Sequence, residues 1–87
     1  MSAQKVNFSK LASTVEKALR DAFPGAAIDT SRGYLGRVHV VIVSPDFKGM
    51  TEKGKQDKVW RELKKRIPVD DLVGVPLVIV YGTDELH

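Results

Sequence analysis

The sequence predicts an α+β domain in which two helices cover one face of a three-stranded mixed sheet, in αββαβ order. Two apolar runs, Val38–Val43 and Val75–Tyr81, have the valine-rich composition of central strands. The helical pattern between them is long enough to carry the chain back to the end of the sheet where the first strand begins, so these strands should run parallel. A loop with two glycines, residues 31–37, joins Val38–Val43 to a weaker strand, Ala26–Thr30, which should pair antiparallel.

Length and composition limit what the chain can be. Its 87 residues suit a single domain, 1–87, and the absence of cysteine excludes disulfides and a thiol nucleophile. No apolar run approaches the roughly 20 residues of a membrane span, and Met1–Lys10 lacks the apolar segment of a secretory signal. We therefore expect a cytoplasmic protein with no membrane partner. The net charge of +3 permits an acidic partner or nucleic acid without requiring either.

Two amphipathic helices are expected. Asn7 is a good N-cap for the first, which ends at Phe23-Pro24-Gly25. The second runs from about Thr51 to Arg66, with a capping hydroxyl at its start, and Pro68 closes it. Its apolar face consists of Gln56, Val59, Trp60, Leu63 and Ile67, and its opposite face carries Lys58, Arg61 and Lys65.

The residues around the first apolar strand resemble those of the BolA family. The strand ends at Ser44. It is followed by a Phe-x-Gly motif formed by Phe47 and Gly49, and further matches to the family are Trp60, Leu63 and Thr83. The resemblance covers nearly the whole chain. It implies the BolA fold, a relative of the type II KH domain, and a non-enzymatic stress-response or transcription regulator. It also implies a monothiol glutaredoxin or DNA as the partner.

The chain departs from the family where an iron–sulfur cluster would be held. Family members carry an Arg-His pair in the first turn of the second helix, where this chain has Lys55-Gln56. The loop before Val38 has neither histidine nor cysteine, and Arg37 stands at its end. Because the neutral amide of Gln56 is a poor ligand for a soft cluster, we expect no metal site, no cofactor and no cluster sharing.

Catalysis is not predicted. His39, Ser44 and Asp46 could be imagined as a triad, but strand alternation puts His39 and Ser44 on opposite sheet faces. We interpret Ser44 and Asp46 as turn residues and His39 as a strand residue rather than a ligand. His87 adds no metal-ligand spacing. No catalytic residue and no small-molecule substrate are therefore expected.

Gly33-Tyr34-Leu35-Gly36 matches the GxxG spacing with which KH domains grip a nucleic-acid backbone. The KH loop joins two helices, whereas this one joins two strands. We interpret it as a hairpin loop with an exposed tyrosine. Trp60 and Tyr81 are expected in the core or at its rim, and Phe47 beneath the turn.

The second helix is the candidate binding element. Between Thr51 and Ile67, seven basic residues face three acidic ones. Its exposed stripe could lie on an acidic protein surface or on phosphates, or be a solvated face. A KH-like module for DNA or RNA is thus the alternative function, although no aromatic residues interleave with the stripe for base stacking. The candidate binding residues are Lys53, Lys55, Gln56, Lys58, Arg61 and Lys65, and the turn motif is Ser44, Phe47 and Gly49.

Overall fold

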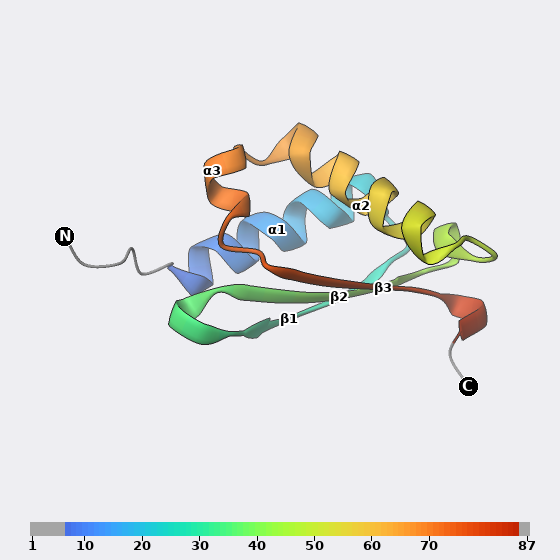
Figure 1. The fold of residues 1–87 in the computed structure, drawn as a ribbon, viewed down its shortest axis with the longest axis horizontal. Helices are drawn as coiled ribbons and strands as arrows, with labels where there is room; N and C mark the ends of the chain where they lie inside the picture. Colours follow the sequence, from blue (N-terminus) through green and yellow to red (C-terminus); the bar gives the residue numbers. More distant parts are fainter. Residues whose placement is uncertain (1–6, 86–87) are drawn as a thin grey trace.

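The computed structural model describes residues 7–85 and arranges them in two layers (Figure 1). The helices α1 and α2 lie on one face of a sheet with strand order β1-β2-β3. β1 pairs antiparallel with β2, and β2 pairs parallel with β3, so the predicted mixed sheet in αββαβ order is confirmed. The elements are α1 (Phe8–Ala22), β1 (Ala27–Arg32), β2 (Val38–Ser44), α2 (Glu52–Arg66), the single-turn α3 (Val69–Leu72) and β3 (Leu77–Gly82).

Both long helices begin at the predicted caps. The side chain of Asn7 accepts a hydrogen bond from the Lys10 N–H at 3.2 Å, and the Thr51 hydroxyl accepts one from the Gly54 N–H at 3.1 Å. These oxygens satisfy amides that the first turn of a helix leaves without an internal partner. Within residues 7–85, no helix is both long enough and apolar enough to cross a membrane.

The boundaries of β1 and β3 differ from the prediction. β1 continues to Arg32, because the hairpin loop is shorter than expected and is closed by the Gly33 N–H, which donates to the Arg37 carbonyl at 2.7 Å. β3 begins at Leu77 rather than Val75. The preceding segment still belongs to the turn after α3, in which the Val75 N–H donates to the Leu72 carbonyl at 2.9 Å.

β2 is the central strand, and its residues alternate between two environments. Val38, Val40, Ile42 and Ser44 are buried beneath the helices, whereas the residues between them are half-buried on the other face. This alternation confirms that His39 and Ser44 lie on opposite faces of the sheet.

The core fills the space between the sheet and the helices. Its fully enclosed side chains include Val15, Leu19, Val59 and Leu63, while Phe8 and Trp60 pack at its rim. Tyr81 does not belong to it. It is 37% exposed and pairs in register with Val43 on the face away from the helices, so its expected place in the core was wrong.

Candidate partner-binding surface

The turn between β2 and α2 is built around one buried aromatic ring. Phe47 has no exposed surface and contacts Phe23 edge to face, with ring centroids 5.1 Å apart. Ser44 is also buried, and its hydroxyl accepts from the Asp46 N–H at 3.0 Å, as its interpretation as a turn residue requires. These contacts set the path of the chain into α2.

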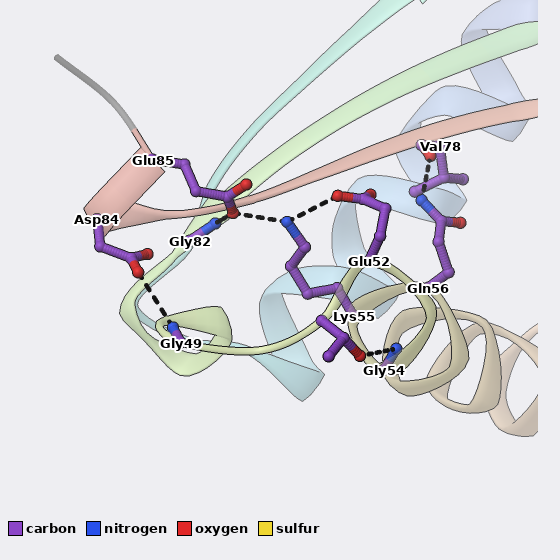
Figure 2. Close-up of polar contacts among 10 residues, drawn as sticks. Gly49, Glu52, Gly54, Lys55, Gln56, Val78, Gly82, Asp84 and Glu85 are labelled. Atoms are coloured by element: carbon purple, nitrogen blue, oxygen red, sulfur yellow. Dashed lines mark hydrogen bonds and ion pairs between the residues drawn. The ribbon is translucent and has the colours of Figure 1, made fainter.

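Gly49 completes the turn. Its φ of +74° lies in the left-handed region, which glycine adopts at little cost. Its N–H donates to a carboxylate oxygen of Asp84 at 3.2 Å, which joins the turn to the segment that follows β3 (Figure 2). The Ser44, Phe47 and Gly49 motif is thus a structural unit that fixes the start of α2.

Lys55 lies inside the protein rather than on the predicted basic surface. Only 1% of the residue is exposed, and its ammonium group lies 2.6 Å from Glu85 and 3.0 Å from Glu52 (Figure 2). Its hydrogen bond to Glu85 is the largest influence and raises the pKa of Lys55 above its ordinary value. Burial opposes this shift, and the hydrogen bond to Glu52 adds to it. Including Lys55 among the partner-binding cations was therefore wrong, because internal carboxylates satisfy its charge.

Gln56 stands where the resemblance to the BolA family implies a histidine. Its amide nitrogen donates to the Val78 carbonyl at 2.8 Å (Figure 2). Its amide oxygen accepts from the Trp60 indole N–H at 3.1 Å. Both ends of the amide are engaged inside the fold. Gln56 thus joins α2 to β3, and its oxygen is already engaged by the Trp60 indole.

Gln56 and Arg37, which stand where the resemblance implies cluster ligands, are not soft ligands for an iron–sulfur cluster. Among residues 7–85, no three side chains of the metal-binding types His, Cys, Asp and Glu gather in a group. His39 is half-buried on the open sheet face, where its ring packs so closely on Gly33 that a Cβ there would lie 2.5 Å from Nε2. His87 lies outside the described residues.

The Gly33–Gly36 segment is a tight turn between two strands, in which the Arg37 N–H donates to the Tyr34 carbonyl at 3.2 Å. Tyr34 is 78% exposed, in accord with the interpretation of a hairpin loop. Leu35 has a φ of +57° and Gly36 one of +76°, so the chain reverses through two consecutive left-handed residues.

The outer face of α2 carries the remaining candidate cations. Lys53 pairs with Asp57 at 2.7 Å, and Lys65 pairs with Glu62 at 3.4 Å. Lys58 and Arg61, one turn apart, form no ion pair with any residue in the range 7–85.

The pKa of Asp57 is lowered by the positive charges on this face. Its hydrogen bond from Lys53 lowers its pKa, and the charges of Lys53, Arg61 and Lys64 lower it further, against the effect of burial. We call Lys53, Lys58, Arg61 and Lys65 the basic face. Lys53, Arg61 and Lys65 are exposed, and Lys58 is half-buried.

Two residues that organise this region were not predicted from the sequence. Glu85 receives the Lys55 ammonium, and the Val78 carbonyl receives the Gln56 amide. Helical spacing places Lys55 four residues before Val59 and eight before Leu63, on the buried side of the helix. That spacing could have predicted its burial, but not a partner thirty residues away in the sequence.

The architecture, two helices on one face of a β1-β2-β3 mixed sheet, defines a small α+β domain. Among solved structures, the chain is similar to the crystal structure of a bol-like protein from Babesia bovis. The TM-score is 0.58 and the identity 18%, over 97% of this chain and 93% of that one. No protein-family model and no curated protein match the sequence. The similarity shows that the chain has the BolA-like fold.

Proposed function

We propose that this chain is a non-catalytic, divergent BolA-like protein that binds an acidic partner through the basic face of α2 and the turn before it. The observation that carries the proposal is the pair Lys58 and Arg61, which neighbour each other on the helix without a carboxylate partner within residues 7–85. Cations that form no close ion pair can attract and orient a negatively charged surface.

The rigid setting of α2 supports this proposal. The N-cap at Thr51, the Lys55–Glu85 ion pair and the Gln56–Val78 hydrogen bond fix the helix against the sheet. A surface whose main chain is already ordered loses less entropy when it binds. The basic face therefore resembles a preformed docking surface more than a flexible basic tail.

The resemblance to the BolA family suggests a monothiol glutaredoxin as the protein partner. In this chain such a complex would rest on charge and shape and would not include a shared cluster, since Gln56 is engaged internally. By occupying the surface of its partner, this chain would regulate the partner.

Nucleic acid is the second candidate. Lys53, Lys58, Arg61 and Lys65 lie along about three turns of one helix, a spacing that suits contacts with successive phosphates. Trp60, which lies between Lys58 and Arg61 in the sequence, packs against the core, and this favours contacts to the phosphate backbone over base stacking.

The direct test is calorimetric titration of a monothiol glutaredoxin into the wild type and the double variant Lys58→Glu/Arg61→Glu. A matched control, Lys10→Glu/Lys17→Glu, makes the same charge change on α1. The proposal predicts that only the α2 variant loses binding. Equal loss in both variants would mean that net charge alone governs binding, and no binding by the wild type would remove glutaredoxin as the partner.

A further inference from the structure

β3 is an edge strand. The strand order places β2 on one side of it, and no other strand of residues 7–85 lies on its other side. The free side of an edge strand presents main-chain N–H and C=O groups that another strand can pair with.

Two side chains occupy these outward groups. Gln56 donates to the Val78 carbonyl at 2.8 Å, and Glu85 accepts from the Gly82 N–H at 2.7 Å (Figure 2). The N–H and C=O of one strand residue point to the same side of the strand, and the side alternates from residue to residue. The main-chain groups of Val78, Val80 and Gly82 therefore point away from β2, and those of the residues between them point toward β2.

The caps stand at both ends of this outward row. Val80, in the middle, receives no side-chain hydrogen bond from the part of the chain that the structure describes. Each cap is itself held in place, Gln56 by the Trp60 indole at 3.1 Å and Glu85 by the Lys55 ammonium at 2.6 Å.

The uncapped row would be complementary to itself. Two copies can align their β3 edges antiparallel about a two-fold axis at Val80, so that Val80 pairs with its copy and Val78 pairs with Gly82. Leu77, Ile79 and Tyr81 would extend their partly exposed side chains across the same open face of the joined sheet. In this arrangement Gln56 and Glu85 lie where the second main chain would have to approach.

We propose that the outer edge of β3 is a latent self-pairing surface, and that Gln56 and Glu85 together block it against a second copy of this chain. The partner is a second copy of this chain, because the outward main-chain groups of Val78, Val80 and Gly82 can pair with the same groups of a copy related by a two-fold axis. Gln56, at the family's histidine position, thus acts as a cap of the sheet edge.

The test is sedimentation velocity over a wide range of protein concentration. The wild type is compared with Gln56→Ala/Glu85→Ala, with Gln56→Ala alone, and with a control, Asp57→Ala/Glu62→Ala, that removes two polar side chains from α2 away from the caps. We expect the wild type and the control to sediment as monomers. The double variant should form a concentration-dependent dimer, and the single variant a weaker one.

Amide hydrogen exchange at Val80 provides the second readout, because edge pairing would protect its outward N–H. Exchange should slow when the variants dimerise. Circular dichroism identifies folded variants, and if the double variant is unfolded, Gln56→Ala alone decides. Folded variants that stay monomeric, dimers with an unprotected Val80 amide, or a wild type that itself dimerises would each overturn the proposal.

Discussion

The Lys55 ammonium lies 2.6 Å from a carboxylate oxygen of Glu85, thirty residues further along the chain. The same oxygen accepts the Gly82 N–H at 2.7 Å. One carboxylate thus satisfies a cation from the first turn of α2 and an amide at the end of β3. A buried lysine is tolerated only when its charge has such partners, so this contact fixes both the position and the orientation of the helix.

This ion pair should make stability depend on pH. The hydrogen bond from Lys55, and after it that from Gly82, lowers the pKa of Glu85 below its ordinary value. A carboxyl with a lowered folded-state pKa stabilises the fold above its unfolded-state pKa and loses that contribution as the pH falls through the folded-state value. The raised pKa of Lys55 acts oppositely, so its contribution holds below its unfolded-state pKa and disappears as the pH rises through the folded-state value.

Urea unfolding of the wild type and Glu85→Gln at a series of pH values measures this effect. The wild type should be more stable near neutral pH. The difference should shrink toward zero as the pH falls below the usual glutamate pKa of about 4.3, because a protonated Glu85 resembles glutamine in charge. A difference that stays constant into acid would show that the ion pair does not stabilise the fold.

Phe47→Ala should be strongly destabilising. The ring is fully enclosed and packs on Phe23, so its removal leaves a cavity beneath the turn and should cost about 3–5 kcal/mol of unfolding free energy. Tyr34→Ala, at a residue that is 78% exposed, should change stability by less than about 0.5 kcal/mol. Equal costs in chemical denaturation would contradict the packing described for this turn.

Gly82→Ala should cost about 1–3 kcal/mol, because the added Cβ would lie 2.8 Å from the Phe47 carbonyl oxygen, a main-chain atom that cannot easily move. Gly25→Ala is the control, since a Cβ there meets no atom within 4 Å. Thermal unfolding of both variants compares them directly. A Gly82→Ala variant as stable as the control would mean that β3 and the turn lie further apart than described.

Binding to random-sequence DNA or RNA tests the alternative function. If four cations of the basic face contact phosphates, the affinity should fall by about a hundredfold between about 50 and 200 mM salt. Lys58→Glu/Arg61→Glu should abolish binding, while Lys10→Glu/Lys17→Glu should retain most of it. No measurable affinity of the wild type at low salt would remove the nucleic-acid function.

Local chemistry made much of the fold predictable. The caps at Asn7 and Thr51, the parallel pairing of the valine-rich strands and the buried Phe47 all follow from short-range patterns. The predicted last residue of β1 and the predicted first residue of β3 each differ by two positions from the structure, because hydrogen bonds in the adjoining turns decide where strand pairing stops and starts. The spacing of Lys55 to Val59 and Leu63 could have predicted its burial. Its partner, Glu85, comes from a distant segment, and no periodicity within α2 predicts that contact.

The same limit applies to Gln56. Helical spacing placed Gln56 on the apolar face of α2, but it did not predict the two hydrogen bonds that engage the Gln56 amide. Replacement of a family histidine could mean either an empty ligand position or a new structural contact. The contacts with Val78 and Trp60 support the second interpretation.

The most direct test of this account is anaerobic co-expression with a monothiol glutaredoxin, followed by visible absorption spectroscopy of the purified complex. The wild type and Gln56→Ala should give the same spectrum, because the amide of Gln56 is engaged by Val78 and Trp60. An iron–sulfur spectrum of the mixed complex that changes when Gln56 is replaced would contradict the account.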